Sequence, residues 1–133
     1  MEQATATRPS QKTEHSLILA SRVTGRDVFN RDGEHLGYVD DLTIEKVSGK
    51  TIYAIMSFGG FLRLNERFHP VPWPLLDYDP ERDAFVVPLD KAALKDAPHY
   101  DLEDLAELGG PSHITYGERI FGYYGPYGSV PYW

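Results

Sequence analysis

The chain contains no cysteine among its 133 residues. That absence excludes disulfides, iron–sulfur clusters, thiolate zinc sites and a thiol nucleophile. Long apolar runs are also missing, since no stretch approaches the roughly 18 apolar residues that a membrane-spanning helix requires. The first residues lack the basic start and the apolar run of a secretory signal. We therefore expect a cytoplasmic protein, which would contact a membrane only through a partner.

Positive charge is scarce. The 13 Lys and Arg residues face 20 Asp and Glu residues, and the formal net charge is −7. Because non-specific nucleic-acid binding depends on basic side chains that neutralise phosphates, we expect no direct nucleic-acid binding. The acidity is uneven: residues 101–133 hold five acids and one base, whereas residues 15–100 hold 13 acids and 10 bases.

The stretch RDGEHLGYVDDL at residues 31–42 raises the question of a metal site, because it concentrates four acids: Asp32, Glu34, Asp40 and Asp41. A calcium loop of the EF-hand type needs an oxygen ligand at position 5 and glutamate at position 12. Counted from Asp32, these positions hold Leu36 and Thr43. The acidic run that starts at Asp77 fails at other positions, because position 6, where glycine is required, holds Arg82 and position 12 holds Pro88. Both runs are interpreted as polar turns.

Catalytic patterns are absent as well. Adjacent Asp40 and Asp41 would point to opposite faces of a strand, so they cannot act together on one substrate atom. Backbone donors at a bulge could hold Asp41. The sequence has neither a nucleophile elbow nor a phosphate loop. The histidines lack ligand spacing: they are His15, His35, His69, His99 and His113. We therefore assign no catalytic, cofactor-binding or metal-ligating residue, and we predict a non-enzyme without a cofactor.

Short apolar segments separated by turn signals predict a mainly β domain. Residues 36–44 alternate well enough for a strand, with a bulge near Asp40, and residues 51–58 are rich in β-branched and aromatic side chains. The prolines at 70, 72 and 74 lack backbone donors, so their segment is an edge strand or an extended exit from the sheet. This pattern predicts a small β-barrel or a curled sheet.

The segments at the two ends of the chain differ from this centre. Residues 1–14 are polar and predict a disordered arm, and residues 17–20 form a first strand or a lead-in. Asp90 can cap a helix, and residues 101–108 predict a second short helix. Residues 109–133 combine glycine and proline with seven aromatic residues. This composition fits a disordered segment, an arm that docks on a partner or on the chain's own barrel, or contact with a membrane interface, and it favours a flexible tail or partner docking. The predicted domain therefore spans residues 15–108.

The order of the central motifs resembles the PRC-barrel family. The pieces that carry this resemblance cover roughly residues 17–97, and they are Asp32 with Gly33, the run Gly37-Tyr38-Val39-Asp40-Asp41, Ser48 with Gly49, the strand at 51–58, Gly59 with Gly60, and Val71-Pro72-Trp73. The resemblance implies a small, highly curved barrel used for assembly and for contacts with other macromolecules. It also implies that Gly37 allows the strand to bend or to be approached closely.

Three functions fit these observations. The first is a non-enzymatic interaction or assembly module that forms a homo-oligomer, because the strand at 51–58 is apolar on both faces. The second is an accessory protein of a membrane complex, since the family includes the cytoplasmic domain of the photosynthetic reaction centre H subunit. The third is an RNA-processing or ribosome-assembly factor, since the family includes the C-terminal domain of a ribosome-maturation factor.

Overall fold

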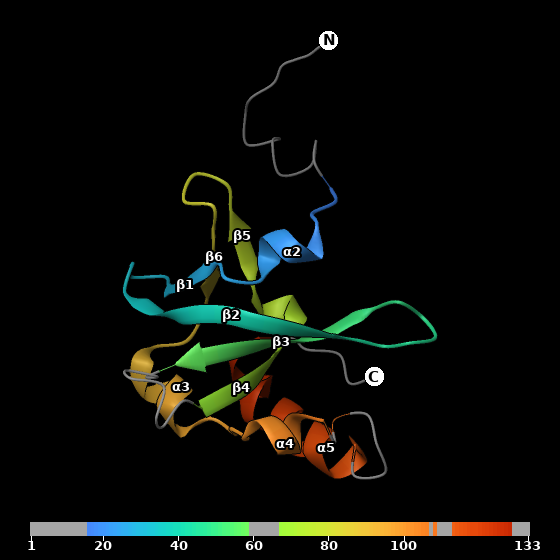
Figure 1. Ribbon diagram of the computed structural model, residues 1–133. Coiled ribbons are helices and arrows are strands. Elements are labelled where there is room, and N and C mark those ends of the chain that lie inside the picture. The colour runs from blue at the N-terminus through green and yellow to red at the C-terminus, as the bar shows by residue number, and fades with distance from the viewer. Residues whose placement is uncertain (1–15, 59–66, 107, 109–112, 129–133) are drawn as a thin grey trace.

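A computed structural model describes residues 16–58, 67–106, 108 and 113–128. Its six strands form one sheet in the order β4-β3-β2-β1-β6-β5 (Figure 1). β1 pairs with β6 in parallel, and every other neighbouring pair is antiparallel. The strands are β1 (Asp27–Asn30), β2 (His35–Ile44), β3 (Thr51–Phe58), β4 (Arg67–Pro72), β5 (Asp77–Asp79) and β6 (Ala84–Val87).

Short helices flank this sheet. Figure 1 shows α2 beside β5 and β6, whereas α3, α4 and α5 gather near β4. The first strand or lead-in expected at residues 17–20 is not a strand, because α2 begins at Ala20. The helices are α2 (Ala20–Val23), η1 (Trp73–Leu75), α3 (Lys91–Asp96), α4 (Leu102–Leu105), α5 (His113–Tyr124) and η2 (Gly125–Tyr127).

The prediction of a mainly β fold is confirmed, but the sheet does not close into a barrel. β4 and β5 are its two edges in the described part of the chain. Pro70 and Pro72 lie in β4 and have no backbone N–H to donate, and β5 has only three residues. The expected edge position of the proline segment is therefore confirmed. The missing N–H groups of β4 and the shortness of β5 leave few backbone hydrogen bonds through which the two edges could pair.

The stretch at residues 31–42 is framework of the sheet. The Asn30 side-chain oxygen accepts hydrogen bonds from the backbone N–H groups of Asp32 and Glu34, at 3.0 and 2.8 Å, which closes the turn between β1 and β2. The register of β2 against β3 shifts between Val39 and Asp41, so the predicted bulge is confirmed. The Asp41 carboxylate accepts a hydrogen bond from the Leu42 N–H at 2.8 Å, which holds the side chain at the bulge.

The backbones of β2 and β3 approach each other closely at Gly37, which faces Ser57 of β3. A Cβ atom at this position would overlap the carbonyl oxygen of Ser57 and would also lie 3.2 Å from its carbonyl carbon. Both are backbone atoms, which cannot turn aside as a side chain would. The close approach expected at Gly37 is therefore confirmed, and it fixes how β2 lies against β3.

The predicted helices after the sheet are present. Asp90 caps α3, since its carboxylate accepts a hydrogen bond from the Ala93 N–H at 2.8 Å. The second helix is shorter than the predicted residues 101–108. α4 ends at Leu105, and Asp101 caps its first turn by accepting from the Asp104 N–H at 2.9 Å.

The expectation of a flexible tail over residues 109–133 needs correction, because residues 113–124 form α5. Ile120 and Tyr124 are fully buried, and Phe121 is 9% exposed. The rings of Tyr53 in β3 and Phe121 lie 5.6 Å apart between centroids. This segment is helical because one face of the helix presents apolar side chains that pack against the sheet. The predicted N-terminal arm, residues 1–14, lies outside the described residues.

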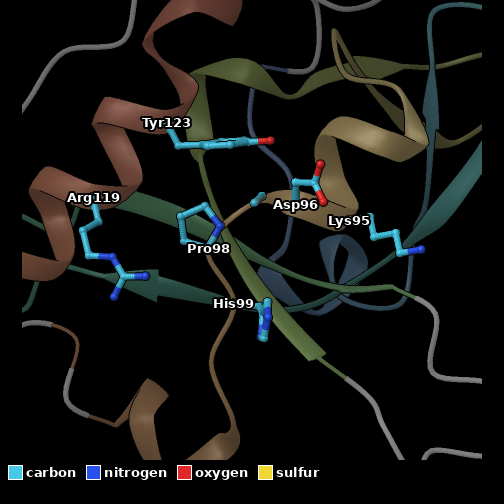
Figure 2. Close-up of a pocket in the computed structure, with 7 residues that line it drawn as sticks. Lys95, Asp96, Pro98, His99, Arg119 and Tyr123 are labelled. Carbon is cyan, nitrogen blue, oxygen red and sulfur yellow. The ribbon is translucent and has the colours of Figure 1, made fainter.

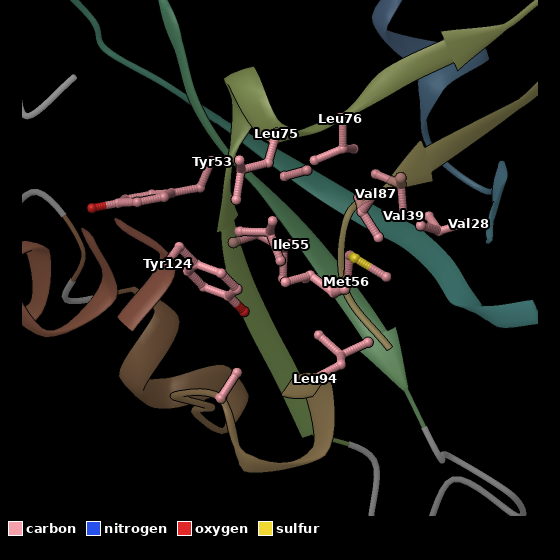
Figure 3. Packing of buried hydrophobic residues seen from close by; sticks show 14 of the residues in the cluster. Val28, Val39, Tyr53, Ile55, Met56, Leu75, Leu76, Val87, Leu94 and Tyr124 are labelled. Atoms are coloured by element: carbon pink, nitrogen blue, oxygen red, sulfur yellow. The ribbon is translucent and has the colours of Figure 1, made fainter. Parts of the chain in front are cut away.

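α5 also accounts for the apolar surplus of the strand at 51–58. Figure 3 shows Tyr53 and Ile55 directed toward the side of α5 and Met56 directed the other way. All three side chains are at most 3% exposed. Both faces of β3 are thus buried within one chain. The face that motivated the expected homo-oligomer is not available to a second copy.

We predict that Gly37→Ala lowers the free energy of unfolding by about 3 kcal/mol, because the added methyl group must push apart two backbones. Urea denaturation followed by circular dichroism measures this change. Gly122→Ala is the matched control, since a Cβ there meets nothing within 4 Å and the residue lies in α5. The control should be neutral or stabilising, because alanine favours helix. Equal losses in both variants would contradict the prediction.

We predict that Ile120→Ala lowers the free energy of unfolding by roughly 2–5 kcal/mol, the range for deleting a fully buried aliphatic side chain. Glu118→Ala, at an exposed position of the same helix, should change it by less than about 0.5 kcal/mol. Denaturation midpoints of the two variants give the comparison. A wild-type midpoint for Ile120→Ala would show that α5 does not belong to the cooperative fold.

Candidate interaction surfaces

The acids of residues 31–42 are dispersed on the surface. Asp32, Glu34, Asp40 and Asp41 are all exposed. Glu34 has a structural role, because it accepts a hydrogen bond from the Asn30 amide at 2.8 Å and lies 3.6 Å from the Lys91 ammonium group. These contacts tie the β1–β2 turn to α3. The arrangement builds the fold, and of these four acids Asp32 alone lines a hollow, beside Asp90.

Two histidines that are distant in the sequence lie together. The rings of His69 in β4 and His99 are 5.6 Å apart between centroids. His35 instead pairs with the Asp27 carboxylate at 3.0 Å. His15 and the side chain of His113 lie outside the described residues. Among the residues that the structure describes, no group of three or more His, Asp or Glu side chains could hold a metal ion.

His69 is a buried titratable group. Its side chain has no exposed surface, and burial lowers its pKa from 6.5 to about 4. The neighbouring charges of His99 and Arg67 lower the pKa further, and the backbone of Pro98 acts in the opposite sense. His69 is therefore neutral in the folded protein at neutral pH, and it packs as a core side chain against Phe58, at 6.2 Å between ring centroids.

An open hollow of about 680 Å³ lies between the N-terminal segment and the β5–β6 hairpin, and we call it the N-terminal groove. The aliphatic segment at residues 17–19, directly before α2, is exposed to solvent: Leu17 is 88% exposed, Ile18 45% and Leu19 70%. Arg22 is the one charged residue of the lining. The groove is lined by Ser16, Leu17, Ile18, Leu19, Arg22, Trp73, Leu76, Tyr78, Pro80 and Phe85.

A polar network holds one wall of this groove in place. Asp83 adopts a positive φ of 52° in the turn between β5 and β6. Its carboxylate accepts a hydrogen bond from the Tyr78 hydroxyl at 2.6 Å and lies within 3.8 Å of Arg22 and 3.5 Å of Arg26. The Tyr78 hydrogen bond, followed by the two guanidinium groups, lowers the pKa of Asp83. This network connects α2 to the hairpin, so the N-terminal segment leaves the sheet at a defined place.

A second open hollow, of about 750 Å³, separates α5 from the segment that follows α3, and we call it the basic cleft. Figure 2 shows Arg119 and Lys95 on opposite sides of Pro98 and His99. Tyr123 forms part of the wall, and its hydroxyl donates a hydrogen bond to the Ala93 carbonyl oxygen at 2.5 Å. The lining consists of Lys95, Asp96, Ala97, Pro98, His99, Arg119 and Tyr123.

One protein-family match covers all six strands of the sheet. The PRC-barrel domain matches residues 15–94, which is more than half of the chain. This chain belongs to the PRC-barrel family. No curated protein matches it. Membership confirms the resemblance carried by the motifs from Asp32 to Trp73. The matched residues end within α3, so α5 lies beyond the part that defines the PRC-barrel domain.

The interaction surfaces of this PRC-barrel chain differ from those expected. Phe121 and Tyr124 belong to the aromatic segment for which docking on a partner or on the chain's own barrel was open, and they are buried in the chain's own core. The segment at 17–19, expected to belong to a strand or a lead-in, is exposed. The sequence indicates this exposure, because three consecutive aliphatic side chains cannot all face one core. In the described part of the chain, no helix is long and apolar enough to cross a membrane.

We predict that the free energy of unfolding falls as the pH drops from about 6.5 toward 4, and that His69→Leu flattens this fall. Below pH 6.5 His69 is protonated in the unfolded state, whereas in the folded state it stays neutral until about pH 4. The contribution is therefore complete above pH 6.5 and is lost on acidification, with a total of about 3 kcal/mol. Denaturation series across this pH range measure the slope.

His35→Gln is the control for this series, because His35 is exposed. It should keep the wild-type slope, since folding does not desolvate an exposed imidazole. If His69→Leu retained the full pH dependence, burial of His69 would not be its source.

Proposed function

We propose that this PRC-barrel chain is a non-enzymatic protein-interaction module that self-associates through the N-terminal groove. The observation that carries the proposal is the exposure of Leu17 and Leu19, at 88% and 70%, beside a concave apolar surface. Single exposed apolar side chains are ordinary, whereas a contiguous exposed patch marks an interaction site. Membership in the PRC-barrel family supports a general role in interaction or assembly.

The energetics favour a partner at this place. Full burial of one leucine side chain contributes about 1.5–3 kcal/mol. Trp73 and Tyr78 in the groove are large and rigid, and aromatic side chains of this kind often dominate the binding energy of an interface. Because Tyr78 is held by Asp83, the groove loses little freedom when it is filled.

A second copy of the chain fits the charge of this surface. With a net charge of −7, two copies repel each other wherever their acids face. The N-terminal groove has one base and no acid in its lining, so contact there avoids that repulsion. The exposed segment at 17–19 itself forms one wall of the groove. A two-fold axis would therefore bring the segment of each copy against the Trp73 and Tyr78 wall of the other copy's groove.

The required area is moderate. A stable interface buries roughly 800 Å² on each partner. That value is about a tenth of the 8162 Å² that the chain exposes. The segment at 17–19 together with the groove is the described surface best suited to supply it, since the apolar face of β3 is covered by α5.

We predict that the wild-type chain has a mass of twice 15.0 kDa at micromolar concentration, and that the double variant Leu17→Ser/Leu19→Ser is a monomer. Light scattering coupled to size-exclusion chromatography measures both masses. Val47→Ser is the matched control, because Val47 is 97% exposed at the tip between β2 and β3, away from the groove. It should leave the mass of the wild type unchanged. A monomeric wild type would contradict self-association.

A further inference from the structure

The basic cleft has a charge opposite to that of the chain. Its lining contains two permanent cations, Lys95 and Arg119, with His99 between them and Asp96 as its acid. Among the other described Lys and Arg side chains, Arg22, Arg26, Arg82 and Lys91 each lie within 4 Å of a carboxylate. No carboxylate of the described residues forms an ion pair with Lys95 or Arg119. In a chain of net charge −7, two cations at one hollow that no described carboxylate pairs with favour an anionic ligand.

The walls of this cleft are held before any ligand arrives. The Arg119 guanidinium carbon lies 5.8 Å from the centroid of the Tyr100 ring. The backbone of Tyr100 exchanges two hydrogen bonds with Phe68 at the end of β4, at 2.9 and 3.2 Å. On the other wall, the bond from the Tyr123 hydroxyl to Ala93 fixes α5 to α3. A pre-formed site lowers the entropy that binding costs.

The shape of the cleft indicates an extended ligand. Figure 2 shows Lys95 and Arg119 on opposite sides of Pro98 and His99, so the two cations would each bind a separate anionic group of one ligand. The surface between them is apolar at Pro98 and at the ring of Tyr123. A peptide that alternates acidic and apolar side chains presents carboxylates at intervals and apolar groups between them. That arrangement matches the order of groups in the cleft.

A nucleic acid matches less well. Its phosphates form a continuous row of charge, and each one that is bound requires a nearby cation. The cleft supplies two permanent cations, and Asp96 lies in the same lining. A carboxylate at that place repels a continuous row of phosphates, whereas a peptide can place an apolar or hydrogen-bonding side chain there. We propose that the basic cleft binds an acidic peptide segment of a partner protein, with Arg119 and Lys95 each pairing with a carboxylate.

The test begins with the full chain and random dodecapeptides displayed on phage. The peptides recovered on the wild type should be enriched in Asp and Glu, alternating with apolar residues. A synthetic fluorescent peptide of the recovered sequence then gives the dissociation constant by polarisation. Binding should weaken on the order of tenfold in the variant Lys95→Glu/Arg119→Glu, and it should also weaken as salt is raised.

The control variant is Lys46→Glu/Lys50→Glu, which changes the net charge by the same amount at exposed positions around the β2–β3 turn. It should bind the peptide as the wild type does. If the reversal at the cleft prevents folding, as circular dichroism would show, Lys95→Gln/Arg119→Gln replaces it, with Lys46→Gln/Lys50→Gln as control. This measurement is independent of self-association, because Leu17→Ser/Leu19→Ser should keep peptide binding.

Three results would overturn the proposal. The first is a set of recovered peptides without acidic enrichment. The second is equal weakening in the cleft variant and its control, which would mean that net charge alone attracts the peptide. The third is single-stranded poly-uridine RNA that binds the wild type in a cleft-dependent way while no acidic peptide binds, which would assign the cleft to nucleic acid.

Discussion

Burial of β3 on both faces is the constraint on which the rest of this fold depends. β3 lies between β2 and β4 in the sheet, and its side chains from Tyr53 to Ser57 are all buried. One face is covered by the curled sheet itself. Within the described residues, the other face is covered by a helix and not by a second sheet. α5 fulfils this role through Ile120, Phe121 and Tyr124, and the folded unit therefore includes residues well beyond the PRC-barrel match.

The parts of the fold that sequence reasoning predicted are those that a few neighbouring residues determine. Asn30 closes a turn, Asp90 caps a helix, and proline keeps β4 at an edge, each through hydrogen bonds or missing donors within its own segment. Openness of the sheet and the docking of α5 depend on contacts between distant segments. The helix also has weak local support, since Gly117 and Gly122 lie inside it and glycine disfavours helix. Packing against the sheet overrides that preference.

The interaction surfaces show the same division. The exposed segment at 17–19 carries a local signal, an apolar triplet without alternation, which fits a lead-in to the fold better than a strand. The basic cleft carries none, because Lys95 and Arg119 come from segments that only the tertiary fold brings together. The contact of His69 with His99 has the same origin. Spacing rules detect sites within one helix or loop, so they could not find either cluster.

The two proposed surfaces have a joint consequence because they are separate. They share no lining residue, and Figure 1 places α2 and β5 away from α3 and α5. A pair of chains joined at the N-terminal groove would therefore leave both basic clefts open. A partner with two acidic segments could then occupy both, and the second contact would form at a high effective concentration. Weak single contacts, as expected for a pair of exposed charges, would in this way support stable assembly. Self-association and recognition of acidic segments would thus reinforce each other, although each rests on different residues.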